Sequence, residues 1–294
     1  EALALLDDAA VLSVPDGQEL VVSTDTLNAG THFLEDAAPG DIAHKALRCA
    51  LSDLAAMGAR PYCYQLSIAF PAPPDVKWLT GFTAALLEDQ KEFDVFCAGG
   101  DTTSINGALS LSVTVMGLVN KGAAVKRSGA KAGDALLLTG PIGDAYIGLK
   151  ALRGELDNCF NANVVKAYLK PLPRFDLLGA VQAYAHAAID ISDGLPADLA
   201  HICRASKVGA RVEMSDALFS KSGNKLIEDG RLSAEELIAG GDDYQLLLAA
   251  SPEDVQHFPG AFVIGAFEAG EGGVSIYDEA GAKLDMKHTG WSHF

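Results

Sequence analysis

The chain has 294 residues, 49% of them hydrophobic and 21% charged, and this length is enough for two packed domains. Its formal net charge of −17 argues against non-specific binding of nucleic acid and against attachment to an anionic membrane surface. An anionic substrate stays possible, because bound metal ions can supply the missing positive charge.

The first half of the chain predicts strands and helices in the order β-α-β-α-β-β, which is typical of an α+β layer domain. A helix-like apolar fragment over residues 1–12 precedes them. The first strand, over residues 20–24, should carry Ser23, Thr24 and Asp25 to its C-terminal end. The remaining predicted elements are helices over residues 41–57 and 75–92, and strands over residues 64–70, 94–98 and 109–119.

A basic link over residues 121–131 follows in an otherwise acidic chain, and it places the boundary between two domains, residues 1–122 and 123–294. The second half predicts another α/β domain. Its predicted strands cover residues 135–139, 209–213, 245–249, 261–266 and 274–277, and its predicted helices cover residues 145–152, 161–169, 174–185 and 196–205.

The five cysteines are scattered, and no two of them stand in a C-x-x-C spacing. Neither a zinc site nor a redox pair is therefore indicated, and we expect a reducing, cytoplasmic compartment. The sequence contains no run of 18 apolar residues and no basic-then-apolar N-terminal stretch, so we expect neither a membrane span nor an export signal.

Acidic residues recur beside apolar runs at five places along the chain. Asp rarely stands in apolar surroundings without a partner or a metal ion, and oxygen ligands suit Mg²⁺. Each motif alone could be a turn or a helix cap, but together they predict a site for several Mg²⁺ ions. The five motifs are residues 23–25, 52–53, 99–101, 190–193 and 240–243.

Three single residues have both a structural and a functional interpretation. Asp53 stands near the C-terminal end of its predicted helix, where the helix dipole disfavours an acid unless a cation compensates it. Arg127 is either a solvated charge of the link or a phosphate ligand. His32 is either a structural residue or a substrate contact on the loop after the first strand.

The sequence excludes several catalytic classes as far as motifs can. It has no Walker-type phosphate loop, no protein-kinase signature and no G-x-S-x-G nucleophile motif. Phosphoryl transfer remains, since there metal ions and positioning do most of the chemistry.

The chain resembles the thiamine-monophosphate kinase family. This family belongs to a superfamily that includes aminoimidazole ribonucleotide synthetase, selenophosphate synthetase and a hydrogenase maturation factor. The resemblance extends over essentially the whole chain. It is carried by Asp7-Asp8-Ala9-Ala10-Val11, Ser23-Thr24-Asp25-Thr26, Gly30, His32-Phe33, Lys45-Ala46-Leu47, residues 51–59, residues 99–103, Arg127-Ser128-Gly129-Ala130, residues 190–195, residues 240–244 and residues 291–294.

The resemblance implies a fold and a reaction. The fold would have an N-terminal mixed sheet with helices on one face, which dimerises and holds the metal and ATP site, and a C-terminal α/β sandwich that closes over nucleotide and substrate. A homodimer would pair through the N-terminal domains, with ATP bound between the two domains. The reaction would move the γ-phosphate of ATP to thiamine monophosphate, giving thiamine diphosphate, with several Mg²⁺ ions.

The resemblance also implies residue roles. Metal ligands would be Asp8, Ser23, Thr24, Asp25, Asp53, Asp101, Asp190 and Asp193, of which Asp25, Asp53, Asp101 and Asp193 would be catalytic. ATP contacts would be Gly100, Asp101, Arg127 and Ser192. Contacts to thiamine monophosphate would be His32, Asp242 and Trp291, the last against the cationic thiazolium ring.

The chain departs from the family pattern at Leu6, where a glycine is usual, at Ser104, where an arginine is usual, and at Asp242, where a glutamate is usual. Two other functions stay open on the sequence. One is an ATP-dependent enzyme of the same superfamily with a different acceptor. The other is an inactive Mg²⁺-nucleotide-binding protein that keeps the fold.

Overall fold

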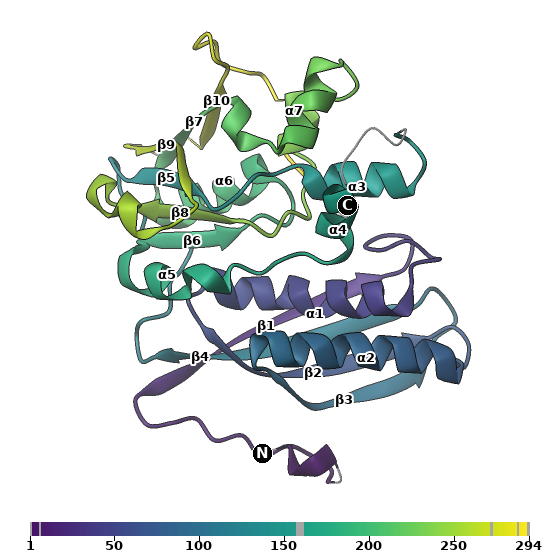
Figure 1. Ribbon diagram of the computed structural model, residues 1–294. Helices are drawn as coiled ribbons and strands as arrows, with labels where there is room; N and C mark the ends of the chain where they lie inside the picture. The colour runs from purple at the N-terminus through teal and green to yellow at the C-terminus, as the bar shows by residue number, and fades with distance from the viewer. Residues whose placement is uncertain (1, 6, 157–161, 271–272, 287, 293–294) are drawn as a thin grey trace. The chain divides into compact units, whose positions relative to one another are not determined.

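The computed structural model of the protein describes residues 2–5, 7–156, 162–270, 273–286 and 288–292. The chain divides into two compact units, Glu1–Ala124 and Val125–Phe294 (Figure 1). Within the described residues, no helix has both the length and the apolar character needed to cross a membrane.

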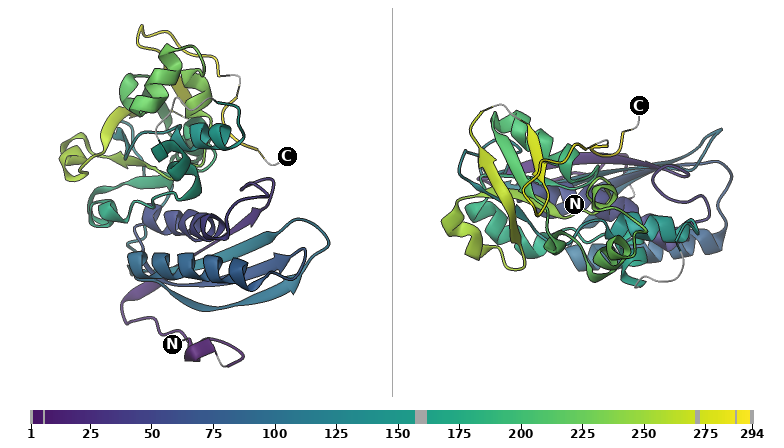
Figure 2. Two further views of the ribbon diagram at one scale, coloured as in Figure 1. Left: turned by 45° about the vertical axis from the view of Figure 1, so that its right-hand side comes forward. Right: turned by 90° about the horizontal axis from the view of Figure 1, so that it is seen from above.

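The first unit is a four-stranded mixed sheet whose strands lie in the order β1-β4-β2-β3. The pairing of β2 with β3 is parallel, and the other two pairings are antiparallel. Two long helices cover one face of this sheet, as Figure 2 shows. The elements are β1 (Gln18–Asn28), α1 (Pro39–Ala56), β2 (Arg60–Phe70), α2 (Val76–Phe93), β3 (Phe96–Ser104) and β4 (Ser110–Asn120), which confirms the predicted order.

Three details of the first unit differ from the sequence prediction. Strand β1 extends to Asn28, because β4 pairs with it along its whole length, so residues 23–25 lie within the strand and not at its end. Residues 99–101 likewise lie inside β3, paired with β2. The predicted fragment over residues 1–12 is only a 3-10 turn at Leu3–Leu5 in the described part of that segment.

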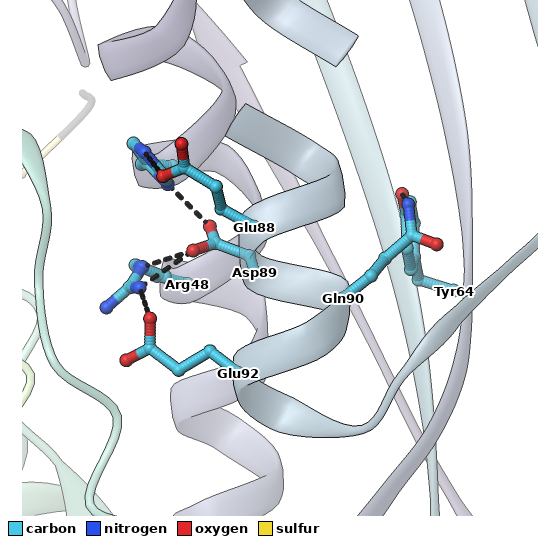
Figure 3. Close-up of polar contacts among 7 residues, drawn as sticks. Arg48, Tyr64, Glu88, Asp89, Gln90 and Glu92 are labelled. Carbon is cyan, nitrogen blue, oxygen red and sulfur yellow. Dashed lines mark hydrogen bonds and ion pairs between the residues drawn. The ribbon is translucent and has the colours of Figure 1, made fainter. Parts of the chain in front are cut away.

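A buried ion-pair network joins α1 to α2 (Figure 3). Arg48, 2% exposed, donates from Nε and Nη2 to Oδ1 of Asp89 at 2.9 and 2.7 Å, and it also donates to Glu92. The Asp89 carboxylate, which is fully buried, also lies 2.9 Å from Nδ1 of His44. These bonds fix the packing of the two helices over the sheet, because a charge buried this deeply is stable only when it is paired.

The second unit is a six-stranded sheet with strand order β10-β7-β9-β5-β8-β6, in which only β10 and β7 are parallel. Helix α6 packs against β6, β7 and β10. The strands are β5 (Ala135–Leu138), β6 (Ala187–Asp190), β7 (Gly209–Glu213), β8 (Leu246–Ala250), β9 (Phe262–Glu268) and β10 (Val274–Tyr277). The helices are α3 (Asp144–Leu152), α4 (Ala162–Leu169), α5 (Leu178–Tyr184), α6 (Leu195–Ser206), α7 (Lys221–Glu228) and α8 (Ala234–Ile238).

The sequence prediction missed β6, α7 and α8. All three are short. Isolated helices as short as α7 and α8 are marginal in water, so tertiary packing decides whether they form, and the four-residue strand β6 forms by pairing with β8. Helix α8 carried a readable signal, because Ser233 and Glu236 form a reciprocal capping box at its start. The predicted helix over residues 174–185 forms only as a 3-10 turn followed by α5.

Candidate functional site

Ser23, Asp25 and Asp53 meet between β1 and α1 in the first unit. Alternate residues of a strand point to opposite faces, and the odd-numbered residues Val21 and Leu27 of β1 are buried on the side of the helices. Ser23 and Asp25 therefore share that side. The Ser23 hydroxyl donates to Oδ2 of Asp53 at 2.5 Å, which joins the strand to the helix.

The electrostatics of this cluster favour a cation. Burial, followed by the negative charge of Asp53, raises the pKa of Asp25 to about 7. Asp53 itself lies in the last turn of α1, which ends at Ala56, so it faces the negative end of the helix dipole. Two carboxylates close together in a partly buried place repel each other, and a divalent cation would remove that repulsion.

Thr24 and Asp101 do not join this cluster through their side chains. The exposed Thr24 hydroxyl lies 2.9 Å from the hydroxyl of Thr114 on β4, on the face of the sheet opposite to Asp25. Asp101 is exposed on β3, at the other edge of the sheet from β1. Three strand spacings separate the two edges, about 14 Å.

Gly100 beside Asp101 stands where no larger residue fits. A Cβ atom there would lie 1.9 Å from the carbonyl oxygen of Leu66 on β2. The glycine therefore lets β3 pass close to β2 and sets the position of Asp101.

Two other predicted site residues of the first unit are Asp8 and His32. Asp8 is exposed, and its N–H lies 3.3 Å from Oδ1 of Asp7. His32 follows β1, and its Nδ1 accepts the backbone N–H of Asn28 at 3.0 Å. Because Nδ1 accepts this bond, a neutral His32 ring would carry its proton on Nε2.

In the second unit, backbone hydrogen bonds collect the predicted residues around the turn between β6 and α6. Asp190 is the last residue of β6 and is buried. The carbonyl of Ser192 accepts the N–H of Asp242 at 2.8 Å, and the carbonyl of Asp193 accepts the N–H of Trp291 at 2.9 Å. Residues far apart in the sequence thus meet here through backbone hydrogen bonds.

Two buried carboxylates hold this region together: Asp243, which the sequence analysis included only in the acidic motif 240–243, and Asp198, which it did not single out. Asp243 accepts the N–H of Gly143 with both oxygens, at 2.9 and 3.0 Å, and burial raises its pKa. Asp198 accepts three backbone N–H groups of the turn after β6, while burial and then the charge of Asp193 raise its pKa to about 7. The signal available in the sequence was an acid among the apolar residues of the helix at 195–206.

Arg127 lies in the link, held against the end of α6. The Ser206 hydroxyl donates to the carbonyl of Arg127 at 3.0 Å and accepts the N–H of Gly129 at 3.1 Å. Burial first, then the charges of Arg204 and Arg127, lower the pKa of His201, while Asp193 acts in the opposite direction. Arg127 and Asp193 are therefore both within electrostatic range of one histidine.

A pocket of about 370 Å³ opens beside Trp291. Its lining combines aromatic, apolar and acidic side chains, which suits a flat organic ring that carries positive charge. The lining includes Tyr146, Glu235, Glu236, Met286, His288 and Trp291. His293 and Phe294, which complete the C-terminal motif, lie outside the described residues, as does Leu6.

Among the described residues, no group of three or more His, Cys, Asp or Glu side chains is arranged to hold a metal ion. Mg²⁺ is commonly held in proteins by one or two carboxylates together with water and substrate phosphates. The pair Asp25 and Asp53, with the Ser23 hydroxyl, fits that kind of partial ligand set.

The chain matches two family descriptions. Residues 6–119 match "AIR synthase related protein, N-terminal domain", and residues 131–274 match "AIR synthase related protein, C-terminal domain". Thiamine-monophosphate kinase of Caulobacter vibrioides is 39% identical over 306 aligned residues, which cover 99% of this chain and 85% of that protein.

Solved structures agree with these relatives. Thiamine-monophosphate kinase from Stenotrophomonas maltophilia K279a is 36% identical, with a TM-score of 0.83 and coverage of 93% of this chain and 90% of that one. A structure described as AaThiL complexed with AMPPCP and TMP is 28% identical, with a TM-score of 0.87 and coverage of 99% and 94%.

Proposed function

The chain belongs to the thiamine-monophosphate kinase family of the AIR synthase related proteins, and on this basis we propose that it phosphorylates thiamine monophosphate with ATP. The product is thiamine diphosphate, and the enzyme is a phosphotransferase with a phosphate group as acceptor. The observation that carries this function is the 39% identity to a thiamine-monophosphate kinase over 99% of the chain.

We propose that Mg²⁺ takes part and that Asp25, Asp53 and Ser23 contribute to its binding in the first unit. When bound, Mg²⁺ would supply positive charge that offsets the repulsion between the phosphates of ATP and of thiamine monophosphate. The protein's own part is to hold the two carboxylates close together before substrate arrives, because preset charges need no rearrangement during the reaction. The proposed ligands Asp8, Thr24, Asp101, Asp190 and Asp193 would complete the metal sites.

In the second unit, Ser192, Arg127 and Asp193 are proposed to contact ATP and its metal ions, and Asp242 and Trp291 to contact thiamine monophosphate. Support comes from the backbone bonds that join Ser192 to Asp242 and Asp193 to Trp291. From the first unit, Gly100 and Asp101 are the remaining proposed contacts to ATP, and His32 is the remaining proposed contact to thiamine monophosphate. Residues 1–122 would carry dimerisation and the metal and ATP site, and residues 123–294 the closure over substrate.

The test of this function is an assay of ATP with thiamine monophosphate, with and without Mg²⁺, that follows thiamine diphosphate by chromatography. Wild type should form product only when Mg²⁺ is present, and Asp101→Asn should form none. If wild type binds ATP with Mg²⁺ but forms no thiamine diphosphate, the acceptor is wrong and other small phosphates should be tried.

A homodimer would explain why Asp101 lies so far from Asp25 in one chain. The face of the first sheet opposite its helices presents apolar as well as hydroxyl side chains, with Val22 56% exposed and Leu20 37% exposed. Asp25 lies on the helix side of β1, but β1 and β3 are the two edge strands of the sheet. A second copy packed on the exposed face with its β3 beside the first chain's β1 could bring its Asp101 around that edge to the first chain's Asp25.

Mixing two inactive variants tests that arrangement. We expect Asp25→Asn and Asp101→Asn to be inactive alone. A mixture refolded together should regain about a quarter of wild-type activity, because half of the random dimers are mixed and each mixed dimer has one intact site of two. Co-refolded Asp25→Asn and Asp53→Asn, both in one cluster, provide the control and should regain nothing. A mixture of Asp25→Asn and Asp101→Asn without activity would contradict the shared site.

Replacing Trp291 tests the proposed binding of the thiazolium ring. Loss of a cation–π contact of about 0.5–2 kcal/mol should raise the KM for thiamine monophosphate by about 2- to 30-fold in Trp291→Ala. Trp291→Phe should raise it less, and the KM for ATP should not change in either variant. Equal effects on both substrates would contradict the assignment.

We also propose a cytoplasmic location. Its support is that the five cysteines are scattered along the sequence with no C-x-x-C spacing, and that Cys97 and Cys203 are free thiols, as expected in a reducing compartment.

A further inference from the structure

The turn between β6 and α6 is shaped by one carboxylate oxygen. Oδ2 of Asp198 accepts the N–H groups of three consecutive residues, Ser192 at 3.0 Å, Asp193 at 3.0 Å and Gly194 at 3.1 Å. Asp198 stands in the first turn of α6 and is only 3% exposed. Its side chain therefore extends back over the N-terminal end of α6 and binds the three N–H groups of the preceding turn.

The carbonyl side of the same turn is also fixed. The Ser192 carbonyl accepts from the N–H of Asp242, and the Asp193 carbonyl accepts from the N–H of Trp291. Gly194 has a φ of 122°, and a Cβ atom there would lie 2.9 Å from the carbonyl oxygen of Ala239. The Asp198 carboxylate thus accepts from the N–H groups of the turn, and the backbone N–H groups of Asp242 and Trp291 donate to two of its carbonyl groups.

From this geometry we propose that Asp198 is a positioning residue for phosphoryl transfer, which fixes the Ser192 hydroxyl and the Asp193 carboxylate for Mg²⁺ and ATP. This inference rests on the proposed function. With a neutral acceptor in place of the carboxylate, the three N–H groups, one buried and two partly buried, would be held more weakly, and the turn would have several arrangements of similar energy. The side chains of Ser192 and Asp193 would then have to be ordered each time ATP binds, which weakens binding.

Asp198→Asn in the full chain tests the inference, because it keeps the side-chain size and removes the charge. We expect the Mg²⁺ concentration for half-maximal rate to rise at least tenfold. The dissociation constant of AMPPCP in the presence of Mg²⁺ should rise by a similar factor, measured by calorimetry. Unchanged values for both would overturn the proposal.

Asp134→Asn is the matched control. Asp134 is also buried in the second unit, 5% exposed, and it accepts a backbone N–H from Lys131 at 2.8 Å and contacts His186 at 2.9 Å. This variant should lose melting temperature, but it should keep the wild-type Mg²⁺ and AMPPCP constants. If both variants shift the constants equally, general destabilisation explains the result and the positioning role is wrong.

If Asp198→Asn is less stable than wild type, a double-mutant cycle measured at a temperature where every variant is folded decides the case. Because Asp198 is proposed to act through Asp193 and Ser192, adding Asp198→Asn to an Asp193→Asn, Ser192→Ala protein should weaken AMPPCP binding little further. Full additivity would overturn the proposal. AMPPCP binding needs no thiamine monophosphate, so a wrong acceptor would appear only in the product assay and would leave this comparison intact.

Discussion

Replacing Asp53 with asparagine should stop phosphoryl transfer and, in the absence of divalent cations, make the protein more stable. Asp53 lies in the last turn of α1 and raises the pKa of Asp25, so its charge meets both the helix dipole and a second carboxylate. Removing it should add about 1 kcal/mol of stability, or about 2–4 °C in melting temperature. The rate should fall about a thousandfold, because a metal's stabilisation of the transition state is worth several kcal/mol.

An Asp-to-Asn substitution at the N-terminal end of α1 provides a control. Asp41 lies in the first turn of α1, where the dipole favours an acid. Asp41→Asn should therefore lower the melting temperature slightly and leave the rate unchanged. A variant Asp53→Asn that is active, or that is less stable than wild type with a chelator present, would show that the acid is structural and not part of a metal site.

Arg48→Met should cause the largest loss of stability of any change considered. Asp89 is fully buried and receives two hydrogen bonds from Arg48, so the variant leaves its charge without that compensation (Figure 3). Breaking a buried ion pair in this way costs about 3–5 kcal/mol. We expect urea denaturation to show this loss as a lower free energy of unfolding of the first unit.

An exposed ion pair gives the comparison. Nζ of Lys225 in α7 lies 2.7 Å from Oδ1 of Asp229, the residue that caps the C-terminal end of this helix, and the Lys225 side chain is 60% exposed. Lys225→Met should therefore cost less than about 1 kcal/mol. If the two variants lose the same stability, the network between α1 and α2 does not fix their packing.

Local patterns were sufficient to predict much of the first unit. The helical spacing of Ile42, Ala46 and Leu47 and the alternation along β4 are properties of a short window, and both elements formed close to the predicted bounds. The strand bounds were less accurate, because the length of β1 depends on its partner β4, about ninety residues later. The hydrophobic pattern around β1 contains no signal of a pairing partner so distant in the sequence.

For the candidate site, too, local residue patterns were informative, whereas long-range contacts could not be predicted. The sequence singled out Asp25 and Asp53 as acids in apolar surroundings, and the structure places them together. It could not show that Asp101 lies at the far edge of the sheet, because strand order is set by long-range pairing. Nor did it single out Asp198, since an acid in the first turn of a helix is common, and only the fold shows what its oxygen contacts.

The strand order of the first sheet has a consequence for how the protein is made. Of the four strands in this sheet, β1 is synthesised first, yet its partner β4 is synthesised last. Until residues 110–120 have been synthesised, β1 with Ser23 and Asp25 has no β4 to pair with. The residues of α1, including Asp53, have been synthesised by then. Pairing over such a long separation is slow, and an unpaired apolar strand can aggregate. Chaperone dependence and sensitivity to translation speed should therefore concentrate in the first 120 residues of the chain.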